Sequence, residues 1–405
     1  MKGNSITHTE AIEILSKEAV VTGTERVLLA ESFNRVLAQE VRAIDNVPPF
    51  DRSPLDGYAF RSCDVKDADR DNPVTLKVID YIPAGDVSHV PVTEGCAVRL
   101  MTGAPVPEGA DCVTMYEVTE FTDEEVKIFS PSKPGDNIVR AGEDVKKGEL
   151  LASCGVRIDA GLAATLAAQN ISEPVCFRQL KIGIISTGSE LVPVGTELTP
   201  GKIHDTNQYS IGGAVENLGF KTIRYGIVAD TADEIAAALT KALSECDAVI
   251  TTGGVSAGDY DVTPDAMEKA GVNVLFRGVK LKPGMACAFG TCKDKMVCAL
   301  SGNPSSSLIT FYVVAAPILR KMSGLKDYEN REIMLTLAED FTKKSKATRV
   351  LKGRLDLSDG TARIRFPEGQ GNVMISSTIG CDCAALIPAG SGPVKAGTVL
   401  KGFLI

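Results

Sequence analysis

Glycines, small hydroxyl residues and carboxylates gather in two short segments of this chain of 405 residues. Glycines let backbone N–H groups approach a phosphate closely, and a nearby carboxylate can hold Mg²⁺. The two sets are Ser186, Thr187, Gly188 and Glu190, and then Thr252, Gly253, Gly254, Ser256 and Asp261. No Gly-Lys-Ser/Thr follows the second set, so it is not a Walker loop. Both predict anion-binding loops with a cation ligand, although a tight turn beside a solvated carboxylate has the same composition.

Two further segments carry positive charge or free backbone N–H groups. Lys280 and Lys282 project to the same side of an extended segment, and Pro283 with Gly284 then turns the chain. A later segment places small residues and a proline at the start of a helix, where an anion can bind. Its residues are Gly302, Asn303, Pro304, Ser305 and Ser306. The alternatives are solubilising lysines and a well-capped helix.

Three polar residues in the first 150 positions complete the candidates. Asp56 precedes a glycine, Thr102 lies in a Thr-Gly turn, and Asp144 follows Gly142 and Glu143. Turn chemistry explains each one alone, so only their combination argues for a site. The histidines have no metal-ligand spacing and pair with no nucleophile. The residues by themselves therefore predict chemistry on a phosphorylated or oxyanionic substrate with Mg²⁺.

Composition indicates an ordinary globular protein with 44% hydrophobic and 23% charged residues. The net charge of −9 argues against nucleic acid or an anionic membrane as the main partner. The eleven cysteines include no Cys-x-x-Cys, which favours buried free thiols in a reducing compartment. The N-terminus is polar, and the longest apolar stretch, 308–319, is shorter than the about 20 residues that span a bilayer. We expect a soluble, cytoplasmic protein.

Elements that would position these residues follow an alternating pattern after residue 180. Buried strands are expected at 181–185, 222–228, 248–252 and 296–300. Helices are expected between and after them at 210–218, 233–244, 264–270 and 304–322. This alternation predicts a parallel α/β sheet, whose ligands bind beyond the carboxyl ends of its strands.

The flanking regions are expected to be mostly β-structure. Thr7 and Glu10 have capping-box spacing and predict an N-terminal helix. Short β-rich runs between 46 and 140, such as 74–79 and 97–101, predict a small β-domain. The Ala-rich segment 160–170 is expected to be a helix that returns the chain to the N-terminal helix, so that the β-domain is an insertion. After residue 327 the runs 332–337, 349–355, 362–366 and 384–388 predict a second β-domain.

At these loops the sequence resembles the molybdopterin molybdenumtransferase family, the MoeA-type proteins related to the E-domain of gephyrin. The matched segments are 53–59, 101–107, 142–145, 186–191, 252–261, 282–284 and 302–306, and they occur in family order along the chain. Each segment alone is moderately specific, and together they are strong.

The resemblance implies a multidomain α/β plus β fold. Residues 1–45 and 143–177 would form an elongated linking domain, and 46–142 an inserted β-domain. Residues 178–326 would form a molybdopterin-binding-type parallel α/β domain, and 327–405 a C-terminal β-barrel-like domain. It also implies a homodimer, in which the cleft between the α/β and C-terminal domains of one subunit receives the inserted β-domain of the other.

The resemblance further implies the reaction: insertion of molybdate into adenylylated molybdopterin, with release of AMP and involvement of Mg²⁺. The glycine and hydroxyl loops would hold the pterin phosphate and the nucleotide, and Lys280 and Lys282 would attract the oxyanion. Asp56 and Thr102 would reach in from the partner subunit, and Asp144 would be a further acid. The metal ion would be organised by Glu190, Asp230 and Asp261. The molybdate pocket would be completed by Pro283, Ser306, Arg349 and Ser376.

Two positions depart from the family pattern. Many relatives carry a second lysine where this chain has Met285, and a proline where it has Ser301. Both positions lie near the expected oxyanion site, so the sequence does not decide between molybdate and tungstate.

Two other functions compete with this one. The α/β domain alone resembles the single-domain molybdopterin adenylyltransferases, which are also the expected partner that supplies the substrate. A non-catalytic, gephyrin-like scaffold is the alternative outside enzymology. The extra domains, with Asp56 and Thr102 in family context, argue against the first alternative. The intact acids and the lack of a long linker argue against the second.

Overall fold

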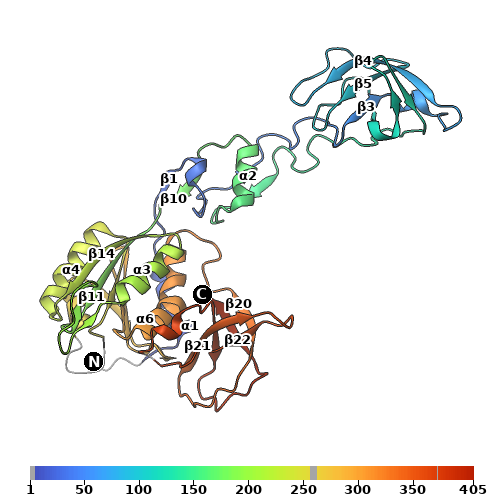
Figure 1. Ribbon diagram of the computed structural model, residues 1–405. Helices are drawn as coiled ribbons and strands as arrows, with labels where there is room; N and C mark the ends of the chain where they lie inside the picture. The colour runs from blue at the N-terminus through green and yellow to red at the C-terminus, as the bar shows by residue number, and fades with distance from the viewer. Residues whose placement is uncertain (1–4, 256–261, 372) are drawn as a thin grey trace. The chain divides into compact units, whose positions relative to one another are not determined.

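The computed structural model describes residues 5–255, 262–371 and 373–405, which group into two compact units. The first unit comprises Met1–Gln39, Cys154–Ala160 and Glu173–Ile405, and the second comprises Glu40–Ser153 and Gly161–Ser172. Figure 1 follows the chain through both units. This division groups the residues differently from the four expected domains, whose boundaries stay a prediction. In the described residues, no helix is long and apolar enough to cross a membrane.

A six-stranded sheet forms the centre of the first unit. Its order is β14 (Lys221–Val228), β11 (Lys181–Thr187), β15 (Ala248–Thr252), β19 (Lys295–Leu300), β18 (Cys287–Cys292) and β16 (Asn273–Arg277). The first four strands are parallel, which confirms the expected α/β sheet. The last two are antiparallel additions that the sequence interpretation missed. Only Lys293 and Asp294 connect β18 to β19, and so short a connection permits only an antiparallel pair.

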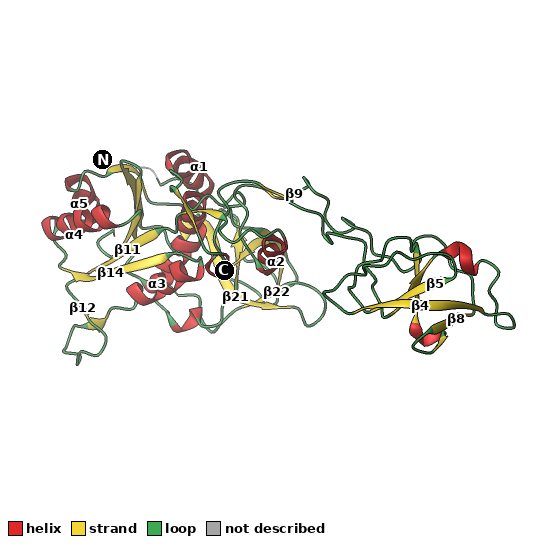
Figure 2. Ribbon diagram, turned by 90° about the horizontal axis from the view of Figure 1, so that it is seen from above, coloured by secondary structure: helices red, strands yellow, loops and turns green. Residues whose placement is uncertain are grey.

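Helices cover both faces of this sheet (Figures 1 and 2). The alternation of side chains along β11 sends Ile182 and Ile184 to one buried cluster and Ile185 to the other. The first cluster is closed by α1 (His8–Glu18), α3 (Asn207–Asn217), α6 (Pro304–Thr310) and α7 (Ala316–Met322). The second is closed by α4 (Ala232–Glu245) and α5 (Thr263–Lys269). All the helices expected around the sheet are therefore present.

The long helix expected over 304–322 is interrupted. A π-helical turn, Phe311–Ala315, separates α6 from α7. Pro317 lies in the first turn of α7, has no N–H to donate and would crowd the preceding turn of a regular helix. The extra residue of the π turn shifts the hydrogen-bond register just before this proline.

The N-terminal helix has the expected capping box but a different neighbour. The Thr7 hydroxyl accepts a hydrogen bond from the N–H of Glu10, and the Glu10 carboxylate accepts one from the N–H of Thr7. Ala11 and Leu15 of α1 pack in the core of the α/β unit, beside α7. Helix α2 (Ala160–Ala168) belongs almost entirely to the second unit, so the expectation that it returns the chain to α1 was wrong. The apolar face of α1 finds its partner in α7 because both are amphipathic and short.

The C-terminal region forms a closed five-stranded barrel. Its strands pair in the cyclic order β21 (Thr348–Asp356), β22 (Arg363–Arg365), β20 (Glu332–Leu337), β24 (Val399–Leu404) and β23 (Cys383–Ile387), and β23 returns to β21. Strand β17 (Leu281–Lys282) adds to β21 from the α/β region, with Lys282 opposite Arg349. A 3₁₀ turn, Ser376–Thr378, lies between β22 and β23. The barrel agrees with the expected C-terminal β-domain.

Paired strands lie at the junctions of the chain. Strand β1 (Thr24–Arg26) pairs with β10 (Val175–Phe177) in the first unit, and β2 (Val41–Arg42) pairs with β9 (Leu150–Ala152) in the second. In the second unit the Gln169 amide accepts hydrogen bonds from the N–H groups of Ile44 and Asp45. Outgoing and returning segments are thus tied side by side, which agrees with an inserted β-domain.

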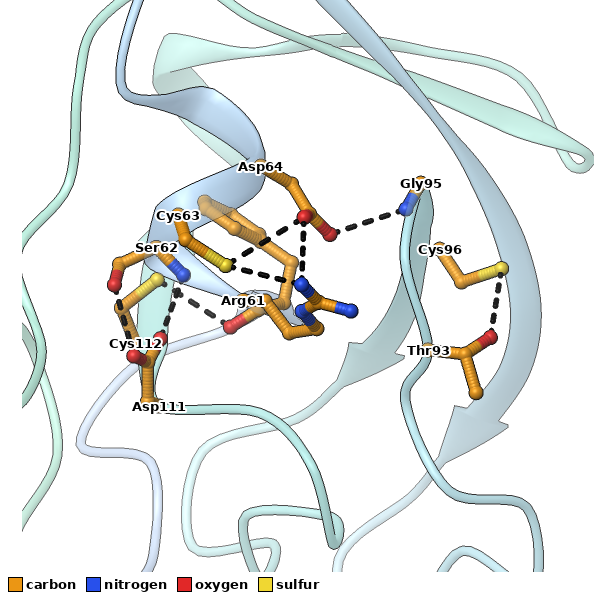
Figure 3. A network of polar contacts seen from close by, with 10 residues as sticks. Arg61, Ser62, Cys63, Asp64, Thr93, Gly95, Cys96, Asp111 and Cys112 are labelled. Carbon is orange, nitrogen blue, oxygen red and sulfur yellow. Dashed lines mark hydrogen bonds and ion pairs between the residues drawn. The ribbon is translucent and has the colours of Figure 1, made fainter.

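The inserted β-domain is a second six-stranded sheet. Its order is β6 (Cys112–Met115), β3 (Gly57–Phe60), β5 (Cys96–Leu100), β4 (Val74–Ile82), β8 (Glu125–Ile128) and β7 (Glu120–Phe121). Figure 3 shows a polar network that ties the 3₁₀ turn Ser62–Val65 to this sheet. Asp111 accepts hydrogen bonds from the N–H and the hydroxyl of Ser62, and Asp64 accepts one from the N–H of Gly95.

All eleven cysteines are free thiols, as expected, but not all are buried. Six are buried, whereas Cys63 and Cys154 are exposed. Burial raises the pKa of the Cys287 thiol to about 12, so this sulfur stays protonated and packs as an apolar group.

We predict opposite stability effects for two glycine substitutions in the α/β unit. A Cβ at Gly290 of β18 would lie 2.5 Å from the carbonyl oxygen of Asn273, whereas a Cβ at Gly213 of α3 would meet nothing within 4 Å. Gly290→Ala should lower the free energy of unfolding by about 1–3 kcal/mol. Gly213→Ala should raise it by up to about 1 kcal/mol, because alanine restricts the unfolded chain. Urea denaturation of both variants checks this, and equal effects would contradict the packing described for β18.

Candidate functional site

A cavity of about 670 Å³ opens at the carboxyl ends of β11, β15 and β19. This is where ligands bind in open α/β sheets. The residues from the predicted loops that line it are Thr187, Gly188, Glu190, Thr252, Gly253, Gly254, Gly302, Asn303 and Pro304. Asp230, which follows β14, joins them, and Val373 and Ile375 contribute from the C-terminal region. Three of the four predicted loops therefore meet in one place.

Backbone packing between the first two loops requires glycine. A Cβ on Gly253 would lie 2.1 Å from the carbonyl oxygen of Thr187, and the φ of Gly253 is +106°. The N–H of Gly253 donates to the carbonyl of Leu300, the last residue of β19. No other residue could bring these three strand ends together.

Most hydroxyls of these loops bind protein groups. The Thr187 hydroxyl donates to the carbonyl of Thr252, and the Thr252 hydroxyl lies 3.5 Å from that of Ser186. Ser186 is fully buried and does not line the cavity, so it supports the loop from below. Ser256 and Asp261, both expected at this site, lie outside the described residues.

Two carboxylates form the charged side of the cavity. Burial, and then the negative charge of Glu190, raise the pKa of Asp230, although the nearby Thr187 side chain partly offsets this. Among the described residues, Oδ1 of Asp230 is buried and has no hydrogen-bond partner. It lies 3.2 Å from where a Cβ of Gly254 would be, so the glycine leaves space in front of it. An unpartnered oxygen beside a second carboxylate fits a divalent cation.

The third ligand of the expected metal site, Asp261, cannot be placed against this pair. In the described part of the chain, no cluster of three or more His, Cys, Asp or Glu residues could hold a metal ion by itself. Glu190 and Asp230 thus provide an incomplete set.

Asn207 links the loop before α6 to helix α3. Its Nδ2 donates to the carbonyl of Gly302 at 2.8 Å, and its Oδ1 accepts from the Ser307 hydroxyl at 3.2 Å. Ser301 accepts a hydrogen bond from the N–H of Asn303. Ser306 is buried and its N–H donates to the carbonyl of Asn303. This loop is therefore held rigidly, and Gly302, Asn303 and Pro304 present its outer side to the cavity.

The lysine segment lies apart from the cavity lining. Lys280 exchanges backbone hydrogen bonds with Ile6 and Thr348, and its positive charge lowers the pKa of Glu10. Lys282 is exposed in β17, and Pro283 follows it. The carbonyl of Gly284 accepts a hydrogen bond from Thr310 of α6, so this turn packs against α6. Lys280 is thus beside α1, whereas Lys282 and Pro283 are nearer to α6.

Arg349 and Ser376 also lie away from the cavity. Arg349 is buried with its guanidinium carbon 5.1 Å from the centre of the Phe341 ring, and burial lowers its pKa. Ser376 borders another cavity, of about 790 Å³, together with Arg354 and Arg365. Their expected contact with molybdate stays a prediction.

Lys352 is a buried cation that the sequence interpretation missed. Its Nζ donates to the hydroxyl of Ser305, in the first turn of α6, at 2.6 Å. The side chain is 3% exposed, and burial lowers its pKa. Strand residues 351–353 offer no local signal for this role, because only barrel closure directs Lys352 toward α6.

Asp205 and Asn207 were missed as well, although an Asp-Thr-Asn sequence before a helix was a usable signal for a helix cap. Asp205 is 1% exposed and lines the cavity. Its Oδ1 accepts hydrogen bonds from the N–H groups of Asn207 and Gln208. It thereby fixes the start of α3 beside the site.

Asp56 and Thr102 lie together in the second unit. Oδ1 of Asp56 accepts hydrogen bonds from both the N–H and the hydroxyl of Thr102, each at 2.7 Å. These bonds, the backbone bond first, lower the pKa of Asp56. Asp144 is exposed in the same unit, where its N–H donates to the carbonyl of Val47. The structure brings the first two residues together as one polar group.

We predict that Thr102→Val raises the pKa of Asp56 only part of the way to the usual aspartate value. The substitution removes the hydroxyl donor but keeps the backbone N–H, which is the larger cause of the lowering. Carboxyl-carbon NMR titration of the wild type and the variant measures this pKa. An unchanged pKa in the variant would show that the hydroxyl bond does not form in solution.

Comparisons with known proteins agree with this geometry. Residues 6–169 match the family model described as the MoeA N-terminal region (domain I and II), and residues 183–321 match the model described as a probable molybdopterin binding domain. The molybdopterin molybdenumtransferase of Bacillus subtilis strain 168 is 36% identical over 94% of this chain and 90% of its own length. That of Haemophilus influenzae is 36% identical over 93% of this chain and 92% of its own.

A solved structure is similar along the whole chain. The molybdopterin biosynthesis moeA protein from Pyrococcus horikoshii OT3 has a TM-score of 0.85 and 32% sequence identity, covering 99% of this chain and 100% of that one. Sequence and structure therefore agree over both the inserted β-domain and the α/β region. The chain belongs to the molybdopterin molybdenumtransferase family and is an enzyme of molybdenum cofactor biosynthesis.

Proposed function

We propose that this enzyme inserts molybdate into adenylylated molybdopterin with the help of Mg²⁺ and releases AMP. The observation that carries the proposal is the Glu190–Asp230 pair, with its unpartnered oxygen, in a cavity built from glycine loops. A cation-dependent reaction of a phosphorylated substrate fits this combination. Family membership supplies the pterin and the metal chemistry.

Glu190 and Asp230, with Asp261, would hold the Mg²⁺. The cation would neutralise charge on the phosphate groups of the substrate and on the leaving AMP. The raised pKa of Asp230 supports this assignment, because the carboxylate lacks a positive partner among the described protein groups. A bound cation removes that penalty.

The loops around the cavity would hold the phosphates and the nucleotide. Gly188, Gly253 and Gly254 lack side chains that would keep a phosphate away from the backbone. Thr187, Thr252, Gly302, Asn303 and Pro304 line the same space. Ser186 supports the first loop, and Ser256 would extend the second.

Molybdate would bind near the start of α6 and the barrel. Lys352 is a buried cation whose one hydrogen-bonded side-chain partner there is a hydroxyl, which suits an incoming oxyanion. Lys282, Pro283 and Ser306 would complete this region. We keep Lys280, Arg349 and Ser376 as outer contributors, because none of them lines the cavity at β11.

The active enzyme would be a cytoplasmic homodimer. Asp56 and Thr102 form a preorganised acceptor group in the inserted β-domain, and we propose that they act in the cleft of a partner subunit, with Asp144 as an additional acid. The adenylylated substrate would come from a molybdopterin adenylyltransferase. No nucleic acid or membrane is needed in this scheme.

We predict that Asp230→Asn raises the melting temperature at pH 7 without divalent cations. A carboxyl whose folded pKa is raised destabilises the folded state once pH exceeds its unfolded pKa. The advantage of the variant should therefore shrink as pH falls below the folded pKa and Asp230 becomes protonated. Mg²⁺ should raise the melting temperature of the wild type at pH 7 but not that of the variant. An equal response of both proteins to Mg²⁺ would place the cation elsewhere.

Single-turnover assays with adenylylated molybdopterin, molybdate and Mg²⁺ test the reaction itself. We predict molybdate-dependent AMP release by the wild type and a loss of about 10²-fold or more in Asp230→Ala and Asp261→Ala, as for other charge-stabilising groups. Asp233→Ala is the matched control, since this side chain is 87% exposed and paired with Lys269. No AMP release with either molybdate or tungstate would refute the proposed reaction.

A further inference from the structure

Asp205 has an oxygen that the fold leaves without a partner. The residue is 1% exposed, and among the described residues its Oδ2 makes no hydrogen bond. Its Oδ1 is fully used, since it accepts from two backbone N–H groups at 3.0 and 3.3 Å. A buried carboxylate oxygen that lines a cavity and lacks a donor costs free energy until a ligand supplies one.

The position of Asp205 argues against a role in cation binding. The pKa of Asp230 is raised by Glu190, and Asp205 is not among the causes of this shift. The described residues also contain no group of three His, Cys, Asp or Glu side chains that could hold a metal ion. Asp205 is therefore separate from the Glu190–Asp230 pair, although all three line one cavity.

The charge of Asp205 argues equally against an anion as its ligand. A phosphate or molybdate would be repelled by a carboxylate, so the remaining partner is a neutral group with N–H donors. Apolar side chains line the cavity as well, namely Leu191, Ile203, Val255, Val373 and Ile375. Such walls suit the faces of a flat heterocycle whose edge carries the donors.

A pterin edge matches this oxygen better than an adenine edge does. The pyrimidinone edge of a pterin presents its 2-amino group and ring N3–H side by side, as a guanidinium presents its donors to a carboxylate. Adenine presents one amino group flanked by ring acceptors, which would face the negative oxygen. We infer that Asp205 recognises the 2-amino-pyrimidinone edge of the substrate pterin through Oδ2 and so orients it in the cavity.

This inference rests on the proposed function for the identity of the substrate, and its test does not use turnover. The probes are 6-hydroxymethylpterin phosphate and the corresponding lumazine, in which a carbonyl oxygen replaces the 2-amino group. Calorimetric titration of the wild type should show about tenfold or greater preference for the pterin, because the lumazine turns an acceptor toward the carboxylate. Equal affinity for the two probes, or no binding of the pterin at millimolar concentration, would overturn the inference.

Two variants locate the preference at Asp205. Asp205→Asn keeps the size and one oxygen for the α3 cap but presents an amide donor to the cavity, so the preference should vanish or reverse. Asp205→Ser keeps a helix-capping hydroxyl and removes the cavity-facing oxygen, so the preference should fall toward equality. Unchanged melting temperatures confirm that the variants fold. Should one variant fail to fold, the other and the wild-type comparison still decide.

AMP serves as the matched ligand control. Its affinity should be the same in the wild type and in both variants, since Asp205 is assigned to the pterin. A preference that persists in both variants, or a loss of AMP affinity with the pterin preference unchanged, would assign Asp205 to another role. Failure of AMP release in the single-turnover assay, with the pterin preference intact, would refute the proposed reaction and leave this recognition standing.

Discussion

The close packing of backbone at the ends of three parallel strands is the constraint on which the site depends. Gly253 lies so near the carbonyl of Thr187 that a Cβ would be 2.1 Å from its oxygen, and its N–H binds the last carbonyl of β19. These contacts form the floor of the cavity and leave no space for a side chain. Asn207 then holds the third loop against α3 through Gly302 and Ser307. The site is thus rigid because its backbone is packed, and ligand binding does not need to order it.

Charged groups around the cavity are buried without counter-ions. Asp230 and Asp205 each have one oxygen without a protein partner in the described residues, and Lys352 reaches only a serine hydroxyl with its ammonium. Each arrangement destabilises the folded protein by itself. Together they suit a ligand that carries a cation, N–H donors and an oxyanion at separate points. Stability is lower here than packing alone would permit, as is common where a protein is preorganised for binding.

The inserted β-domain contributes a different kind of group. Asp56 is held by two hydrogen bonds from Thr102, and Gly57 beside it must lack a side chain, because a Cβ there would lie 2.1 Å from the carbonyl oxygen of Thr114. The carboxylate is therefore ionised and fixed in direction before any partner approaches. The network around Asp111 and the turn Ser62–Val65 stiffens the same sheet (Figure 3). A rigid domain can present such a group to a second molecule at little entropic cost.

Local sequence determined the elements and most of the loops. Hydrophobic periodicity and glycine turns predicted the four parallel strands and their helices, because these signals act over a few residues. The loops after β11 and β15 and the one before α6 were found for the same reason, since the parallel topology brings strand ends together. The antiparallel strand β16 and the π turn before Pro317 were missed, because each depends on what packs beside it.

Tertiary structure alone decided which charged side chains face the cavity. Nothing near Lys352 in the sequence distinguishes it from Arg349, yet barrel closure turns Lys352 toward Ser305 and stacks Arg349 on Phe341. Likewise, a carboxylate before a helix predicts a cap, but only the fold leaves the second oxygen of Asp205 buried and without a partner. Side-chain direction on a strand and the burial of one atom are set by segments far away in the chain. Local pattern therefore determines which residues could act, and long-range packing determines which of them meet.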